Sequence, residues 1–264
     1  MAIILNIETS TDVCSVALTK DGHSIWDKED HGDGHSSKAA ELLPEFVDEA
    51  MEQLMSNEKL DAVAISGGPG SYTGLRIGMS MAKGLAYGSD AKLIAVSSLE
   101  VMCVPILLGH ELEDDALLCP MIDARRMEVF AAIYDRALTP VRKTQADIVE
   151  ADTYKEFLNE HPVYFLGNGA AKCKEVITHP NAHFIDNIVP LARHMMPLAE
   201  KRYHKGEFED VAYYVPDYGK EYEAKLPKKY YKDEFTRTGL QHRKKAHTST
   251  PLWTLAVRSV RKND

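Results

Sequence analysis

The chain has 264 residues, of which 44% are apolar and 27% charged, and a net charge of −9; this is the composition of an ordinary globular protein. No apolar run reaches the roughly 18 residues of a membrane span, and Glu8 follows an N-terminus without basic residues, so we expect neither a membrane protein nor a signal peptide. The 4 cysteines lie far apart without a CxxC pair. This spacing favours reduced thiols over a disulfide framework or zinc site, and we predict a cytoplasmic protein.

The first part of the chain predicts three strands followed by alternating helices and strands. A continuous apolar run over 3–7 indicates a buried central strand. Asp21-Gly22 indicates a hairpin between strands over 12–19 and 23–28. Helical spacing of apolar residues predicts a helix over 36–55. The same reasoning then predicts a strand over 62–65, a helix over 73–87, a strand over 93–96 and a helix from Leu99.

The same order of elements recurs in the second part of the chain. A weak third strand is expected to begin near Ile148. The other predicted elements are strands over 116–122 and 128–134, a helix over 152–158, a strand over 163–166, a helix over 170–177, a strand over 183–185 and a helix over 189–203. Two such copies predict an α/β protein with a duplicated ribonuclease-H-like (actin-like ATPase, ASKHA) two-lobed fold. A cleft between the lobes is the usual place for a ligand.

Three regions are predicted: an N-terminal lobe over 1–109, a C-terminal lobe over 110–222 and a basic tail over 223–264. Residues 225–264 carry eleven basic and three acidic side chains, a net charge of +8. The composition favours a loosely packed appendage, and an RNA-phosphate-binding tail is the alternative. The acidic remainder repels nucleic acid, so contact with RNA needs a local basic patch, this tail or another subunit.

The stretch GGPGSYTGLRIG, residues 67–78, joins a predicted strand to a predicted helix. Glycine-rich turns in this position often cradle phosphate. Here, however, the Lys-Ser/Thr pair of a P-loop is missing, and Pro69 removes one amide donor. The interpretation that follows is that the turn chiefly positions the helix behind it.

Several stretches together carry a resemblance to a known family. They are GGPGSYTGLRIG, the opening ILNIETSTDVCSVAL, GHSSKAAELLP at 34–44, AVSSLE at 95–100, MIDARRMEVFAAIY at 121–134 and, more weakly, FLGNGA at 165–170. Over residues 1–222 the chain resembles the TsaB (YeaZ) family. The tail is not part of the family pattern, so nothing is carried over to it.

The resemblance implies the actin-like fold and a role as a partner subunit without catalytic activity or cofactor. In this family the protein binds and stabilises TsaD, which transfers threonylcarbamoyl to the adenosine beside the anticodon of tRNAs that read ANN codons. A TsaE-like ATPase docks on the pair and tRNA is met through the complex; whether the isolated subunit is a monomer or a homodimer is left open by the sequence. The rival hypothesis from a different class is an independent ATPase or small-molecule kinase.

The two N-terminal helices are the predicted partner interface, since the resemblance implies that they meet the corresponding helices of TsaD or of a second copy in a four-helix bundle. The alternative is that both helices are fully covered within one chain. The candidate interface residues are Ala39, Leu43, Phe46, Ala50, Met51, Leu75, Met79, Met81 and Leu85.

The cleft residues give weaker expectations. Hydroxyls and carboxylates there suggest vestigial nucleotide binding, although local hydrogen bonds that close a hairpin turn explain Thr and Ser equally. Catalytic relatives hold a metal through His-x-x-x-His, and the matching stretch 97–103 has no histidine, so we expect no metal. No histidine–carboxylate pair accompanies Ser71 and Cys14 is expected to be buried, so no catalytic residue is assigned. The candidate nucleotide-binding residues are Thr9, Ser10, Thr11, Asp12, Gly68, Gly70 and Asp123.

Overall fold

A computed structural model describes residues 2–32 and 39–220 of the chain. Residues 1–221 form one unit, which contains two five-stranded sheets. The basic tail predicted over 223–264, and with it the RNA-binding tail hypothesis, lies outside the described residues. The boundary predicted between the lobes at 109–110 falls between the last helix of the first lobe and the first strand of the second.

The first sheet has the strand order β3-β2-β1-β4-β5. Its central strand β1 (Ile3–Glu8) is antiparallel to β2 (Cys14–Lys20) and parallel to β4 (Ala62–Ser66). β3 (His23–Asp30) and β5 (Lys92–Val96) form its edges. Every residue of β1 is buried, as expected for the apolar run that defines it.

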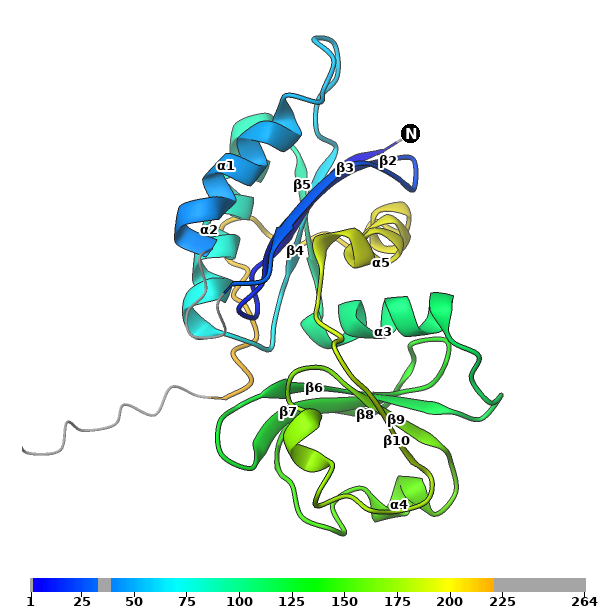
Figure 1. Cartoon of the computed structure of the whole chain (residues 1–264). Helices are drawn as coiled ribbons and strands as arrows, with labels where there is room; N and C mark the ends of the chain where they lie inside the picture. Colours follow the sequence, from blue (N-terminus) through cyan, green and yellow to red (C-terminus); the bar gives the residue numbers. More distant parts are fainter. Residues whose placement is uncertain (1, 33–38, 221–264) are drawn as a thin grey trace, which may run out of the picture. The chain divides into compact units, whose positions relative to one another are not determined.

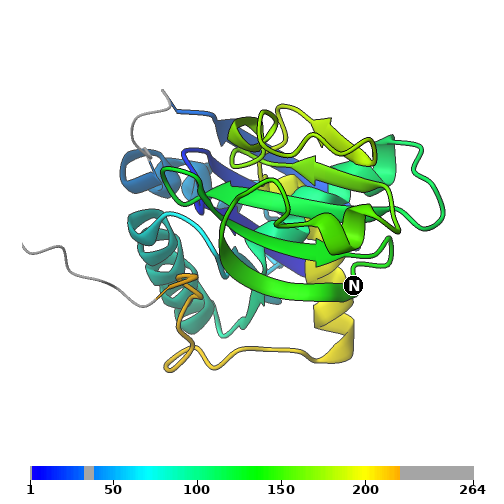
Figure 2. The same cartoon turned by 90° about the horizontal axis from the view of Figure 1, so that it is seen from below.

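Helices cover both faces of this sheet (Figure 1). α1 (Ala39–Met51) and α2 (Tyr72–Ser89) lie on one face, against Leu5, Ile7 and Ile65. α5 (Ala192–Lys205) lies on the opposite face. Figure 2, which views the chain from below, also shows α1 and α2 side by side, in agreement with their contacts.

α3 (Ser98–Gly109) links the two sheets. Val101 and Val104 belong to the core that α5 and the first sheet share. Leu99 and Met102 belong instead to a core formed with the second sheet. Because apolar surface is needed on both sides, the sequence of α3 is apolar around most of its circumference.

The second sheet has the order β10-β9-β6-β7-β8, so each lobe has the same arrangement and the predicted duplicated α/β fold is confirmed. The first connections are antiparallel and the next two parallel, as in the first sheet. Its elements are β6 (Leu117–Asp123), β7 (Glu128–Tyr134), β8 (Pro140–Ile148), α4 (Lys155–Leu158), β9 (Val163–Leu166), the 3-10 turn η1 (Ala171–Cys173) and β10 (Ala182–Ile185).

Two expectations for the second lobe were wrong, and a third had the wrong first residue. The third strand ends at Ile148 instead of beginning there; it is an edge strand of mostly polar residues, which carries a weak apolar signal. The helix predicted over 170–177 contains only the 3-10 turn η1. The last helix begins at Ala192 and not at 189, because Leu191 before it is extended, and it packs on the first sheet.

Among residues 2–32 and 39–220, no helix combines the length and the apolar character needed to cross a membrane.

Candidate functional site

The glycine-rich turn between β4 and α2 is bonded to its own chain. The amide of Gly67 donates to the carbonyl of Val96, and the amide of Ser71 donates to the carbonyl of Ser10, each at 2.7 Å. The side chain of Ser71 caps α2 by accepting from the amide of Gly74 at 3.3 Å. These amides are therefore unavailable to a phosphate, in keeping with a turn that positions a helix.

The turn needs glycine because backbone segments approach closely there. A Cβ on Gly74 would lie 2.0 Å from the carbonyl oxygen of Thr9, and one on Gly70 would lie 2.3 Å from that of Ser10. At Gly78 the obstacle is the Thr9 hydroxyl, at 2.2 Å. The glycines thus let the first turns of α2 rest directly on the end of β1.

The predicted partner interface divides into a buried set and a half-buried set. Met51, Met81 and Leu85 are half-buried and pack on the rim of the core. The others are part of the core of the chain or, for Leu75, fully buried, so the expectation that they contact a partner directly needs correction: the sheet beneath already covers them. This buried set is Ala39, Leu43, Phe46, Ala50, Leu75 and Met79.

The accessible part of this region is the outward face of α2. Ile77, Met81 and Leu85 are half-buried and recur every four residues, so they follow one flank of the helix. Ser80, Gly84 and Gly88 have the same spacing and are exposed. We call these six residues the α2 outer face. That a partner covers it stays a prediction.

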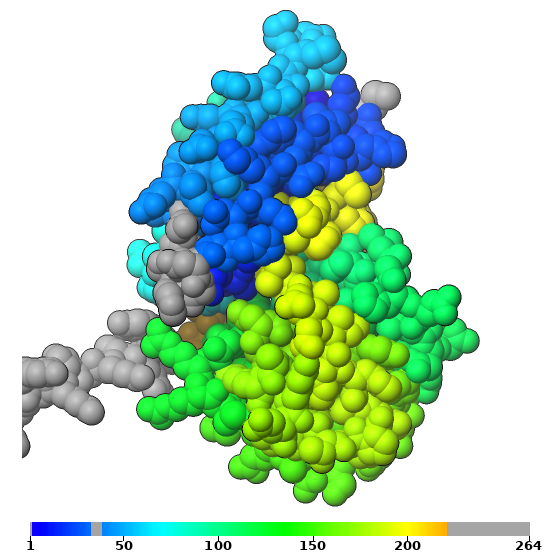
Figure 3. Space-filling view, viewed as in Figure 1, coloured from blue at the N-terminus to red at the C-terminus, as the bar shows by residue number. Residues whose placement is uncertain are grey.

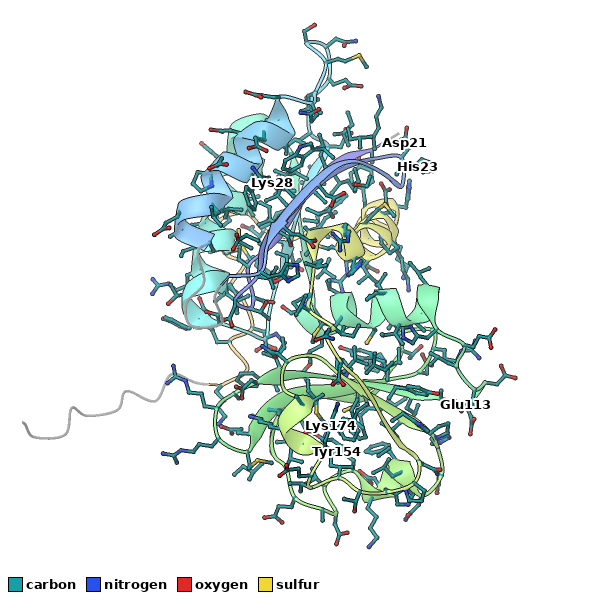
Figure 4. The ribbon with its side chains drawn as sticks, viewed as in Figure 1. Asp21, His23, Lys28, Glu113, Tyr154 and Lys174 are labelled. Carbon is teal, nitrogen blue, oxygen red and sulfur yellow. The ribbon has the colours of Figure 1, made fainter. Side chains whose placement is uncertain are left out.

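α1 is fastened to the sheet beside α2. Lys28 of β3, labelled in Figure 4, reaches from the strand to the helix. Its ammonium group bonds Glu45 at 3.2 Å and Glu49 at 2.6 Å and lies 4.7 Å from the ring centre of Phe46. The helix face that carries the predicted interface residues is therefore held from the strand side.

A cavity of about 580 Å³ lies between the two lobes. Figure 3 shows a hollow with blue atoms of the first lobe above it and green atoms of the second lobe below it. Five of the seven candidate nucleotide-binding residues line the cavity, together with Ser71 and Thr73. These five are Ser10, Thr11, Asp12, Gly70 and Asp123.

The other two candidates lie elsewhere. Thr9 is buried and its hydroxyl donates to the carbonyl of Gly74 at 2.8 Å. Gly68 lies beneath the C-terminal segment, where a Cβ would be 2.0 Å from the carbonyl oxygen of Asp217. Neither residue lines the inter-lobe cavity, and Gly68 lines a second cavity instead; their role in nucleotide binding stays a prediction.

Lysines neutralise two of the carboxylates that line the cavity. The Lys172 ammonium group pairs with Asp123, and that of Lys220 pairs with Glu128. The carboxylate of Asp123 also accepts from the amide of Arg125 at 2.8 Å. Asp123 is thus engaged by its own chain, and nucleotide binding in this cavity stays a prediction.

Glu8 is the one fully buried carboxylate at the end of β1. Burial raises its pKa to about 6, against hydrogen bonds from Ser10 and Ser66 that lower it. Its Oε1 accepts from the amide of Ser10, whereas its Oε2 has no hydrogen-bond partner among the described residues. The group is therefore held in an environment that favours its protonated form.

A second cavity, of about 470 Å³, was missed by sequence reasoning. It lies beside the segment that follows α5, from which Glu209, Tyr214 and Asp217 line it. Gly67, Tyr134 and Arg202 also belong to its lining. The guanidinium of Arg202 bonds Glu100 at 2.9 Å and the carbonyl of Ala95. Residues this far apart in sequence share no spacing signal, so only the fold brings them together.

The catalytic and metal expectations were tested only in part. Cys14 is fully buried, as expected, and burial raises its pKa to about 12, which disfavours the reactive thiolate at neutral pH. Within residues 2–32 and 39–220, no three His, Cys, Asp or Glu side chains gather as a metal site would require. The expectation that the whole chain holds no metal stays a prediction.

Comparisons with known sequences identify relatives across most of the chain. The family model of the tRNA N6-adenosine threonylcarbamoyltransferase TsaD matches residues 35–240. The tRNA threonylcarbamoyladenosine biosynthesis protein TsaB of Escherichia coli is 30% identical, over 81% of this chain and 93% of that protein. The protein of the same name from Bacillus subtilis is 32% identical, over 66% of this chain and 74% of that protein.

Solved structures agree on the fold. A Pseudomonas aeruginosa protein described as uncharacterized, with similarity to peptidase YEAZ, superposes with a TM-score of 0.70 at 24% identity. The match covers 83% of this chain and 100% of that one.

Proposed function

The chain belongs to the TsaB (YeaZ) family, and we propose that it is a non-catalytic scaffold subunit in the synthesis of tRNA threonylcarbamoyladenosine. In this role it binds a TsaD-like transferase and keeps it in its working form. The names of the TsaB relatives support the pathway. The match to the transferase family model supports a partner of related fold.

The observation that carries the scaffold role is the α2 outer face. A glycine inside a helix costs about 0.5–1 kcal/mol relative to alanine. At Gly84 and Gly88 an added Cβ would meet nothing within 4 Å, so no contact within the described chain requires glycine there. Small residues on an exposed helix face let a partner helix approach closely.

The half-buried apolar side chains beside Ser80, Gly84 and Gly88 also suit contact with a partner helix. Met81 is flexible enough to adapt to a partner surface, and Ile77 and Leu85 continue its flank along the helix. A stable interface buries roughly 1,200–2,000 Å² in total. In the proposed assembly the α2 outer face, together with α1 and neighbouring loops, contributes one side of such an interface.

The inter-lobe cavity supports a role without catalysis. The amides of Gly67, Ser71 and Gly74 are bonded to the chain, and lysines neutralise Asp123 and Glu128. In the proposed assembly the transferase supplies the catalytic groups, a TsaE-like ATPase docks on the pair, and tRNA is met through the complex in the cytoplasm. In isolation the same α2 outer face joins two copies of the chain as a homodimer.

The test is co-elution with the transferase subunit on gel filtration. Gly84→Leu improves helix propensity and adds a large side chain to the α2 outer face. The chain should therefore fold but no longer bind the transferase. Gly109→Leu is the matched control, because Gly109 also faces open space but ends α3. Retention of the complex by the Gly84 variant would contradict the assigned face.

The rival reading needs its own measurement on the lone chain. Titration with ATP and magnesium, followed by a turnover assay, should give no steady hydrolysis. Sustained turnover would overturn the non-catalytic assignment in favour of an ATPase or small-molecule kinase.

A further inference from the structure

The turn between β6 and β7 is braced by two segments far apart in sequence. The side chain of Asn168 accepts from the amide of Asp123 at 3.0 Å. The ammonium group of Lys172 donates to the carbonyls of Arg126 and Glu128, at 2.7 and 2.6 Å, in addition to its pairing with Asp123. The stretches MIDARRMEVF and FLGNGAAK therefore form one structural unit.

Glycines allow this unit to close. A Cβ on Gly167 would lie 2.3 Å from the carbonyl oxygen of Met121, and one on Gly169 would lie 3.0 Å from the carbonyl carbon of Ile122. The loop after β9 therefore packs directly on the end of β6. These contacts between the loop after β9 and the end of β6 hold the β6–β7 turn in place.

Two consecutive arginines occupy the tip in the left-handed region of backbone conformation. Arg125 has φ 74° and Arg126 has φ 52°. For residues other than glycine, asparagine or aspartate this region is unfavourable, and unfavourable backbone positions concentrate at functional sites. A turn selected only for stability would have glycine here, so the presence of two arginines needs another reason.

Both guanidinium groups are available at the surface. Arg125 and Arg126 are exposed, and neither forms an ion pair with any residue of the described chain. The two nearby lysines, Lys172 and Lys220, form ion pairs with Asp123 and Glu128. The turn therefore presents unneutralised positive charge on a chain whose net charge is −9.

The surroundings of the turn suit a phosphate group. Arg125 lines the inter-lobe cavity together with the hydroxyl-bearing residues Ser71 and Thr73. Arginine and hydroxyl donors are the usual partners of phosphate oxygens. Arg126 does not line the cavity, so the pair spans from the cavity to the surface outside it. A single nucleotide within the cavity would leave Arg126 unused, whereas a ribose-phosphate chain passing its mouth engages both.

We propose that the Arg125–Arg126 turn contacts the phosphate backbone of the tRNA on which the transferase acts. The inference rests on the proposed function, since it places RNA at the assembled complex. It supplies the local basic patch that an acidic protein needs for contact with nucleic acid.

The experiment measures tRNA binding by the complex of the full chain with its transferase subunit. Unmodified transcript of a tRNA that reads ANN codons is titrated at several salt concentrations between about 50 and 200 mM. For Arg125→Gly/Arg126→Gly, affinity should fall and the slope of log K against log salt should decrease by about one per arginine. Glycine adopts the left-handed backbone freely, so the variant keeps the turn.

Two controls isolate the charge. Arg125→Lys/Arg126→Lys should retain most of the slope. Arg136→Ala removes an exposed arginine from the β7–β8 turn of the same lobe, where it pairs with Asp114 at 2.8 Å, and should leave binding unchanged. Gel filtration of every variant checks that the complex still forms.

The outcomes separate the two claims. An unchanged slope in an intact complex would overturn the RNA contact and leave the scaffold role standing. Loss of ATP binding with unchanged tRNA binding would also overturn it, by assigning the phosphate to a nucleotide. Failure of the unsubstituted chain to join the transferase would overturn the proposed function, and the inference with it.

Discussion

The hydroxyl of Thr9 donates a 2.8 Å hydrogen bond to the carbonyl of Gly74 and thereby ties the end of β1 to the first turn of α2. Gly74 has no side chain to prevent this approach, and its amide donates to the side chain of Ser71, the N-cap of α2. The central strand of the first lobe therefore positions the helix that carries the proposed partner face. A fully buried strand and the helix of the proposed interaction surface are thus joined through this hydrogen bond.

Glycines of the same helix should respond oppositely to alanine. Gly74→Ala places a Cβ 2.0 Å from the Thr9 carbonyl oxygen, and the forced shift should destabilise the chain by about 2–3 kcal/mol. Gly84→Ala meets open space and should stabilise it by about 0.5–1 kcal/mol. Urea unfolding of both variants checks the sign of each change; equal destabilisation would contradict the division of the helix into inner and outer faces.

Phe46 and Met81 should separate folding from assembly. Phe46 is 3% exposed, so Phe46→Ala should cost about 3–5 kcal/mol and an aspartate there should unfold the chain. Met81 is half-buried on the rim, so Met81→Asp should leave a folded chain that no longer joins the transferase. Circular dichroism and gel filtration on the same samples report the two effects, and a folded Phe46→Asp variant would argue against the burial of this face.

The buried carboxylate of Glu8 should make stability depend on pH. Its pKa is raised in the folded state from 4.5 to about 6, so the folded chain binds the proton more tightly than the unfolded chain. Stability from this group is present below pH 4.5 and is lost as pH rises through 6, in total about 2 kcal/mol.

Glu8→Gln cannot ionise and serves as the reference. Denaturant unfolding at pH 4.5, 6 and 8 should show the wild type losing stability relative to this variant as pH rises. Asp12→Asn, at an exposed position, is the control and should not reproduce the trend. A constant difference between wild type and Glu8→Gln across this range would contradict the raised pKa.

A buried polar network should hold the second lobe together. The guanidinium of Arg142 bonds both oxygens of Asp147, at 3.2 and 2.5 Å, and the hydroxyl of Tyr154 donates to Asp147 at 2.7 Å; Figure 4 labels Tyr154. Asp147→Asn leaves the guanidinium without its charge partner and should cost about 3–5 kcal/mol. Tyr154→Phe removes one hydrogen bond and should cost about 1–2 kcal/mol, and thermal unfolding that ranks the two the other way would contradict this account.

The β6–β7 turn should be more stable without its arginines. Arg126→Gly relieves a backbone at φ 52° and should raise the free energy of unfolding by about 0.5–1 kcal/mol. Arg136→Gly, in the neighbouring hairpin turn, has no such strain to relieve, since Arg136 does not have a positive φ, and should be neutral or destabilising. A loss of stability in Arg126→Gly would show that the left-handed backbone there carries no cost.

Local patterns predicted the order of the elements because that order depends on burial along a single strand or helix. The apolar run of β1 indicates a buried strand, and the apolar spacing in α2 indicates which face of the helix is buried. Asp21-Gly22 indicates where two strands connect. The bounds of β8 were mispredicted, because a polar edge strand such as Pro140–Ile148 depends on pairing with its neighbour β7 more than on its own composition. α5 was predicted as a helix, but which sheet it covers depends on the whole chain.

Within the candidate sites, the sequence by itself determined the residue types and the glycine-rich turn before α2, since glycine spacing and hydroxyl-rich turns are local properties. Only the tertiary structure decided which predicted interface residues remain accessible. Leu43 and Phe46 are buried against the sheet, whereas Met81 and Leu85 are half-buried at the edge of the core. The tertiary structure also brought Asn168 and Lys172 under the Arg125–Arg126 turn. Local pattern fixes what each segment can bury, whereas competition among all segments for the same sheet faces decides what is left outside.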